Sequence, residues 1–157
     1  MSNHNSGKKT FVSCSTKGTK ALGRKAAARL VGQGQRSAAL ILELRGDLGG
    51  GKTTFMQGFA EGLAISDKII SPTFVIMKKF KLRGLSFKFL YHIDCYRLQK
   101  PEEILELGWQ EIIADPANIV AVEWPERIGK FLPASCLRLD FVFLDKNKRQ
   151  ITINGKR

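Results

Sequence analysis

Cysteine and histidine are scarce in this chain of 157 residues. The three cysteines (Cys14, Cys95 and Cys136) are far apart and form no CxxC pair, and the histidines are His4 and His92. These numbers argue against a disulfide framework and a zinc site, and they favour a reducing, cytoplasmic location. We therefore expect His92 to be a packed or hydrogen-bonded strand residue rather than a metal ligand.

Long apolar runs are also missing. No window approaches the 18 or more consecutive apolar residues of a membrane-spanning helix, so no membrane association is expected. The first residues lack the apolar segment of a secretory signal peptide. The chain is 43% hydrophobic and 25% charged, which is ordinary for a globular protein. We expect residues 1–12 to form a flexible basic tail and residues 13–157 to form a single domain.

Acidic residues are absent from the first 42 positions, which hold eight Lys or Arg. A second basic cluster consists of Lys78, Lys79, Lys81, Arg83 and Lys88. The formal net charge of +12 attracts polyanions, and RNA or nucleotide is the obvious class of partner. The alternative is a basic protein from a lineage that favours lysine, because charge alone gives only non-specific attraction.

The hydrophobic pattern predicts alternating strands and helices. Helical signals occupy residues 16–34, 52–65 and 100–113, and apolar runs typical of buried strands occupy residues 37–47 and 118–126. Two hairpins are expected, one turning at Arg83-Gly84 between residues 71–82 and 85–94, the other turning at Asn147 within residues 136–156. The fold class is therefore α/β, with a mostly parallel central sheet, antiparallel hairpin additions and flanking helices.

The stretch "GDLGGGKT", from Gly46 to Thr53, matches the phosphate-binding pattern G-x-x-x-x-G-K-[ST] between a predicted strand and a predicted helix. Its glycines let backbone N–H groups turn toward a phosphate, and the helix N-terminus adds positive potential. Lys52 is expected to reach the β- and γ-phosphates, and the Thr53 hydroxyl to bind Mg²⁺. The predicted nucleotide-binding residues of this loop are Asp47, Leu48, Gly49, Gly50, Gly51, Lys52, Thr53 and Thr54.

Two apolar strands end in carboxylates, "FLYHID" in Asp94 and "NIVAVE" in Glu123. In a P-loop site such acids bind Mg²⁺ or orient the attacking water, so both are candidate catalytic and metal-binding residues. Which of them touches the metal stays open. The segment "SPTF" is either a switch loop, in which the Thr73 hydroxyl senses the γ-phosphate, or a rigid turn that begins a strand.

The nucleotide is expected to be ATP, because the chain has no N-K-x-D guanine-binding motif and no D-x-x-G loop. Three functions then compete. The first is an ATPase, the second is a small-molecule or nucleoside kinase with "KKFKLRG" as its lid, and the third is an RNA-binding module with an inactive P-loop. The hairpin setting of "KKFKLRG" argues against a mobile lid, and intact Lys52, Thr53, Asp94 and Glu123 argue against an inactive site.

The motifs "GDLGGGKTTF", "SPTF", "YHIDCYRL", "PEEILELGW", "VEWPE", Leu132-Pro133 and "KRQITI" occur in this order. From about Thr19 to Ile153 the chain closely resembles the TsaE (formerly YjeE) family, the bacterial P-loop ATPase of tRNA threonylcarbamoyladenosine biosynthesis. The combination of H-x-D-x-Y-R and E-W-P-E behind the P-loop is far more specific than the loop alone.

This resemblance implies a P-loop NTPase fold, and it implies ATP and Mg²⁺ as cofactors. Carried over to this sequence, it makes Glu123 the second Mg²⁺-associated residue and Asp94 necessary for hydrolysis. It also implies that Ser71–Phe74 form the switch loop and that Trp124 lies close to the nucleotide. Arg149 and the segment from Thr16 to Thr19 are expected to flank the adenine.

The resemblance also implies partners. Proteins of this family are thought to bind the TsaD–TsaB pair, in which TsaD transfers the threonylcarbamoyl group to adenosine 37 of ANN-decoding tRNAs. Hydrolysis of ATP would reset that complex, with weak activity of the TsaE-type protein alone. Contact with tRNA is expected to be indirect or through the basic patches. The chain departs from the family pattern in Gly50, where alanine is usual, and in a longer basic N-terminal extension.

Overall fold

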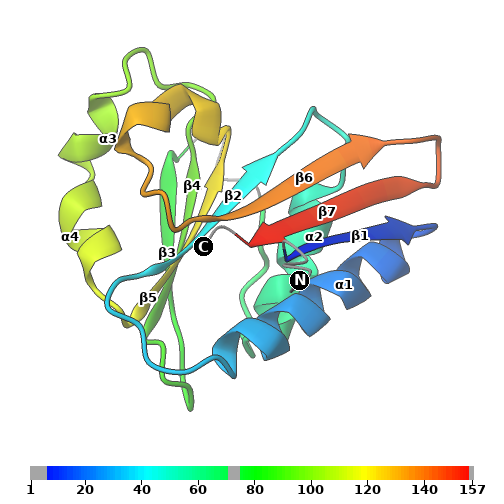
Figure 1. The fold of residues 1–157 in the computed structure, drawn as a ribbon, viewed down its shortest axis with the longest axis horizontal. Coiled ribbons are helices and arrows are strands. Elements are labelled where there is room, and N and C mark those ends of the chain that lie inside the picture. The colour runs from blue at the N-terminus through cyan, green and yellow to red at the C-terminus, as the bar shows by residue number, and fades with distance from the viewer. Residues whose placement is uncertain (1–6, 71–74, 156–157) are drawn as a thin grey trace, which may run out of the picture.

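The computed structural model describes residues 7–70 and 75–155. Within these ranges seven strands form one sheet in the order β1-β7-β6-β2-β5-β4-β3 (Figure 1). The strands are β1 (Lys8–Ser13), β2 (Leu40–Arg45), β3 (Met77–Lys81), β4 (Phe89–Asp94), β5 (Asn118–Glu123), β6 (Leu137–Phe143) and β7 (Arg149–Gly155). The helices are α1 (Thr16–Val31), α2 (Lys52–Gly62), α3 (Glu103–Glu106), α4 (Trp109–Ala114) and the 3₁₀ segment η1 (Pro125–Phe131).

The predicted class is confirmed. Strands β4, β5, β2 and β6 are parallel neighbours, while β3, β7 and β1 join them antiparallel. Both predicted hairpins are present, β3 with β4 and β6 with β7. The parallel strands β2 and β5 are almost continuously apolar because helices and loops cover both of their faces.

Each face of the sheet has its own core. Helices α1 and α2 cover one face, where Phe55 and Phe59 of α2 pack with Leu42 and Leu44 of β2. Helices α3 and α4 lie on the opposite face beside β4 and β5, where Trp109 is buried with Ile93 and Val122 (Figure 1). Over strands β6, β7 and β1 no helix of the described residues covers this second face (Figure 1).

Helices α1 and α2 cross at glycines. A Cβ atom on Gly58 would lie 2.0 Å from the Lys20 carbonyl oxygen, and one on Gly23 would lie 2.2 Å from the carbonyl oxygen of Phe55. Any side chain at either position would therefore push the helices apart. Because α2 starts from the phosphate loop, this crossing fixes the direction in which the helix N-terminus points.

The flexible tail predicted for residues 1–12 is wrong for residues 8–12. These residues form β1, which pairs with β7 from Lys8↔Asn154 to Ser13↔Arg149. The Thr10 and Thr152 hydroxyls lie 3.2 Å apart across the pair. Short, polar β1 has little pattern of its own, and the free edge of β7 supplies the backbone partners that order it.

The single helix predicted for residues 100–113 is divided into α3 and α4. Gly108 separates the two with φ of 77°, a left-handed conformation that ends one helix and begins the next. The break lets Trp109 turn into the core, where its indole N–H donates to the Phe131 carbonyl at 3.1 Å. None of the helices in the described ranges has the length and apolar character needed to cross a membrane.

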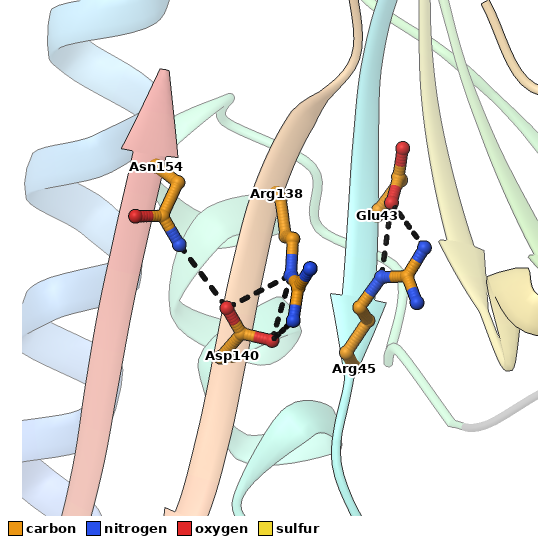
Figure 2. A network of polar contacts seen from close by, with 5 residues as sticks. All are labelled: Glu43, Arg45, Arg138, Asp140 and Asn154. Atoms are coloured by element: carbon orange, nitrogen blue, oxygen red, sulfur yellow. Dashed lines mark hydrogen bonds and ion pairs between the residues drawn. The ribbon is translucent and has the colours of Figure 1, made fainter. Parts of the chain in front are cut away.

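Two groups of polar contacts lie on the face of the sheet that carries α3 and α4, one within β2 and one across β6 and β7 (Figure 2). Arg45 donates from Nε and Nη2 to Glu43 Oε2 at 3.0 and 2.8 Å, and Glu43 is fully buried. Arg138 Nε lies 2.9 Å from both carboxylate oxygens of Asp140, and this bonding raises the pKa of the Arg138 guanidinium. Asn154 Nδ2 donates to Asp140 Oδ2 at 3.1 Å. The Arg138–Asp140–Asn154 contacts therefore link β6 to β7 within the hairpin.

Candidate functional site

The phosphate loop connects the end of β2 to the start of α2. Gly46, Gly49 and Gly51 have φ of 142°, 78° and 97°, values that favour glycine. At Gly46 the requirement is also steric, because a Cβ there would lie 2.4 Å from the Phe141 carbonyl oxygen. The loop can therefore turn its N–H groups toward an anion, and the N-terminus of the 11-residue helix α2 adds its partial positive charge.

Lys52 begins α2 and is 6% exposed. Its ammonium donates to the backbone carbonyls of Gly46 and Asp47, the latter at 3.2 Å. The same Nζ atom lies 4.9 Å from the centroid of the Trp124 ring. The cation is thus held at the inner curve of the phosphate loop by groups that carry no formal charge, so its own charge stays available for an anion.

The two strand-end carboxylates lie side by side. Asp94 of β4 and Glu123 of β5 are register partners in a parallel pair, and they are 4% and 3% exposed. The Cys95 N–H donates to the Glu123 backbone oxygen at 3.0 Å, which ties the two strand ends together. Asp94 Oδ1 accepts the Tyr96 N–H at 2.9 Å. Both carboxylates therefore lie at the carboxyl ends of adjacent strands, at one edge of the sheet.

His92 lies behind Glu123. It is fully buried on β4, two residues before Asp94 and on the same face of the strand. Its Nε2 atom is 2.8 Å from Glu123 Oε1. The expectation that His92 is a packed, hydrogen-bonded strand residue is confirmed. Its partner is one of the two candidate acids, so it fixes the direction in which that carboxylate points.

A cavity of about 540 Å³ opens between the phosphate loop and the β6–β7 hairpin. This volume is in the range of small-molecule and cofactor sites. The structure brings nearly all of the predicted site residues to its wall: Thr16, Thr19, Asp47, Leu48, Gly49, Gly50, Gly51, Lys52, Thr53, Thr54, Asp94, Glu123, Trp124 and Arg149. Thr73 and the remainder of the predicted switch loop, residues 71–74, fall outside the described residues.

The far wall of the cavity comes from the start of β7. Arg149 Nε donates to the Gly49 carbonyl at 2.8 Å, and Nη1 donates to the Asp145 carbonyl at 2.8 Å. Its guanidinium carbon lies 4.5 Å from the Phe143 ring centroid. Arg149 therefore links the hairpin directly to the phosphate loop. Thr19 is 3% exposed, and its hydroxyl lies 2.8 Å from that of Ser13.

An aromatic pair stands beside the carboxylates. Trp124 has a left-handed backbone with φ of 55°, which turns the chain directly after Glu123. Its ring lies 5.0 Å from that of Tyr96, centroid to centroid, and Arg127 lies 5.8 Å from the Tyr96 ring on the outside. Tyr96 is 44% exposed, so this pair connects the cavity to the surface.

Sequence reasoning missed four residues that line the cavity: Ser15, Tyr96, Lys146 and Asn147. Tyr96 follows Asp94 by two residues, so its position after a strand-end acid was a usable signal. Ser15 accepts the Gly18 N–H at 3.0 Å and caps α1, a role that its sequence context also indicates. Lys146 and Asn147 reach the cavity only because their hairpin folds over the loop, and no local pattern predicts that.

The donor set fits Mg²⁺. The described residues contain no group of three or more His, Cys, Asp or Glu side chains that could hold a metal by themselves. Mg²⁺ does not need one, because it takes one or two carboxylates together with phosphate oxygens and waters. Thr53, Asp94 and Glu123 offer such hard oxygen ligands on the wall of the same cavity.

Comparisons with known proteins agree with one another. The family model described as "Threonylcarbamoyl adenosine biosynthesis protein TsaE" matches residues 13–151. Two proteins named "tRNA threonylcarbamoyladenosine biosynthesis protein TsaE" are similar to the chain. The one from Nostoc sp. is 38% identical over 79% of this chain and 75% of its own length, and the one from Bacillus subtilis is 40% identical over 73% and 69%. A crystal structure of Bacillus subtilis YdiB matches with a TM-score of 0.72 at 28% identity, covering 99% of this chain and 90% of that chain.

Proposed function

The chain belongs to the TsaE family of threonylcarbamoyl adenosine biosynthesis, and on that basis we propose that it is a Mg²⁺-dependent ATPase that acts as a subunit of the tRNA-modifying machinery. One observation carries the proposal. Lys52, Thr53, Asp94 and Glu123 all line one cavity beneath a glycine loop that opens a helix. A P-loop nucleotide site needs these four groups.

In this proposal the phosphate loop, Lys52 and the two carboxylates have separate roles. The backbone N–H groups of residues 47–53 and the N-terminus of α2 hold the phosphate chain. Lys52 exchanges its contacts with loop carbonyls for the β- and γ-phosphates. Thr53 and one of the two carboxylates hold Mg²⁺, which supplies charge neutralisation at the phosphates. The other carboxylate orients a water molecule for attack on the γ-phosphate.

His92 has a positioning role in this scheme. Its hydrogen bond at 2.8 Å holds one oxygen of the Glu123 carboxylate, and Glu123 lines the cavity. Trp124, the next residue after Glu123, has a left-handed backbone that turns the chain. The His92 hydrogen bond and this turn together restrict the movement of Glu123. A carboxylate held in this way needs little reorganisation during the reaction.

The partners in this proposal are the TsaD–TsaB heterodimer and, through it, tRNA, in the cytoplasm. Cleavage of ATP changes the conformation of the protein and so its grip on the heterodimer, which resets the complex after a modification cycle. The contact between exposed Tyr96 and half-buried Trp124 supports a link between the nucleotide and a docked protein, because the pair runs from the cavity to the surface.

The kinase alternative loses its main structural support. The segment 78–84, which would have served as a lid, belongs to edge strand β3 and its turn, and none of its residues lines the cavity. A lid has to reach the nucleotide, so this segment does not qualify.

The test is Mg²⁺-dependent ATP hydrolysis by the purified protein, alone and with TsaD–TsaB, with Lys52→Ala as the blank. Low activity alone that rises with the heterodimer is the expected result. Activity that ignores the heterodimer and instead phosphorylates an added hydroxyl compound would replace this proposal with the kinase.

A further inference from the structure

The basic residues of the β3–β4 hairpin differ from those of α1 in how far they are neutralised. We call Lys78, Lys79, Lys81, Arg83 and Lys88 the edge cluster. Among the described residues none of these five side chains forms an ion pair. In α1, by contrast, Lys20 and Arg24 both pair with Glu61, at 3.6 and 2.6 Å.

The sequence around the edge cluster contains no compensating charge. The 26 residues from Lys68 to Ile93 include six Lys or Arg and no Asp or Glu. All members of the cluster except Lys78 are exposed. This segment therefore carries only positive formal charge, which is the composition typical of a polyanion-binding surface.

The position of the cluster at the end of the sheet adds donors to these charges. Strand β3 is the last in the sheet order and pairs only with β4 in the described part of the chain (Figure 1). Its outer backbone N–H groups therefore face away from the sheet, and phosphate oxygens commonly accept such donors. Lysines on an edge strand also prevent pairing with other chains. That purpose does not account for Arg83 and Lys88, which lie outside β3.

Aromatic rings hold one of the cations in place. Lys79 Nζ lies 3.9 Å from the centroid of Phe89 and 5.4 Å from that of Tyr91. A cation placed on a ring keeps its charge but loses freedom, so less entropy is lost when it meets a phosphate. Lys79 is therefore a charge held in place within the edge cluster.

We propose that the edge cluster binds the phosphate backbone of structured RNA, and, on the basis of the proposed function, that this RNA is tRNA. The rings near the cluster are unavailable for base stacking, since Phe80, Phe87 and Tyr91 are at most 8% exposed and Lys79 covers Phe89. Binding without stacking reads the backbone rather than the bases. The cluster therefore prefers folded RNA to unpaired strands and has little sequence preference.

The test compares two triple variants of the full-length chain. One is Lys79→Gln, Lys81→Gln and Lys88→Gln in the cluster, and the other is Lys17→Gln, Lys25→Gln and Arg29→Gln in α1. Each removes three exposed positive charges, so both variants have a net charge of 12 − 3 = +9. Binding of fluorescently labelled tRNA transcript is followed by anisotropy over a series of KCl concentrations.

The cluster variant is expected to bind tRNA at least ~10-fold more weakly at low salt, with the slope of log K against log[KCl] smaller by about 2 to 3, because each lost phosphate contact removes ~0.7–0.9 from that slope. The α1 variant keeps nearly the wild-type slope. Lys→Arg at the three cluster positions keeps the charge and should restore binding. Equal losses in both glutamine variants would show attraction by net charge alone and overturn the proposal.

Two further measurements distinguish the possible failures. The ATPase rate of the cluster variant without partners should equal that of the wild type, because no cluster residue lines the nucleotide cavity. Loss of RNA binding with an intact ATPase therefore supports the cluster separately from the proposed function. Displacement of the RNA by poly-glutamate at equal charge concentration would instead assign the cluster to an acidic protein segment.

Discussion

The two sides of the proposed nucleotide cavity are built in different ways. One side, which we call the strand side, is formed by the ends of the parallel strands β4 and β5. Their last residues, Asp94 and Glu123, are nearly inaccessible to solvent and fixed by register. On the other side, the antiparallel wing of β1, β7 and β6 brings in Arg149, which meets Gly49 across 100 positions of sequence. The buried side suits chemistry, because its groups cannot move far. The wing suits binding, because its contacts are exposed and its own strands lie at the end of the sheet.

The largest effect is expected for Lys52, which begins α2 at the end of the phosphate loop. Lys52→Ala should weaken ATP binding by more than ~100-fold, since two charge-assisted hydrogen bonds to phosphates at about 1.5–3 kcal/mol each are lost. Calorimetric titration with ATP and Mg²⁺ measures the change. Lys68→Ala, at an exposed position, is the matched control and should bind normally. If the Lys52→Ala variant still bound ATP tightly, the phosphate loop would not be the nucleotide-binding site.

Substitutions of the two carboxylates on the strand side should lower the rate of ATP hydrolysis without a comparable loss of ATP affinity. Asp94→Asn and Glu123→Gln are expected to keep ATP binding within a few-fold and to lower the hydrolysis rate by ~10²–10⁴, the usual contribution of a positioned acid or base. Single-turnover hydrolysis and equilibrium binding are measured on the same preparations. Normal hydrolysis by both variants would mean that neither carboxylate is catalytic.

His92 tests whether the buried side depends on orientation. His92→Leu removes the hydrogen bond that holds Glu123 and should lower the hydrolysis rate by about 10-fold, since a hydrogen bond to a charged group is worth about 1.5–3 kcal/mol. His92→Gln restores an N–H donor and should recover most of the rate. If both variants hydrolysed ATP equally slowly, and both had the thermal unfolding midpoint of the wild type, the contact would have no positioning role.

The same division decides how much was predictable from sequence. Strand β2, helix α2 and the positions of Asp94 and Glu123 at strand ends were predicted correctly, because local patterns determine these elements. The tail prediction failed at β1, whose partner β7 lies more than 130 positions away and leaves no mark on residues 8–13. Lys146 and Asn147 were missed for the same reason. They enter the site because their hairpin folds over the phosphate loop, where Arg149 of β7 donates to the Gly49 carbonyl.

A substitution in the wing should affect ATP affinity more than the rate of ATP hydrolysis. Arg149→Ala breaks the contact between β7 and the Gly49 carbonyl and is expected to weaken ATP binding by about 5- to 10-fold, in line with ~1 kcal/mol for an exposed hydrogen bond. Hydrolysis at saturating ATP should change by less than twofold. Lys148→Ala, on the same hairpin but outside the cavity wall, is the control. A larger effect on rate than on affinity would contradict the assignment of binding to the wing.

The smallest expected effect is a difference in reactivity between the cysteine thiols on the two sides of the cavity. Burial, with the nearby Asp94 and Glu126 charges, raises the pKa of Cys95 to about 12, whereas Cys14 next to β1 is exposed. In the folded protein iodoacetamide at pH 8.5 should therefore modify Cys14 and spare Cys95, as peptide mass spectrometry can measure. The raised pKa means that this thiol favours the folded state below pH 9, and that the contribution is lost as the pH rises toward 12. Rapid labelling of Cys95 at pH 8.5 would show that the strand side opens, and the contrast between a rigid strand side and a looser wing would fail.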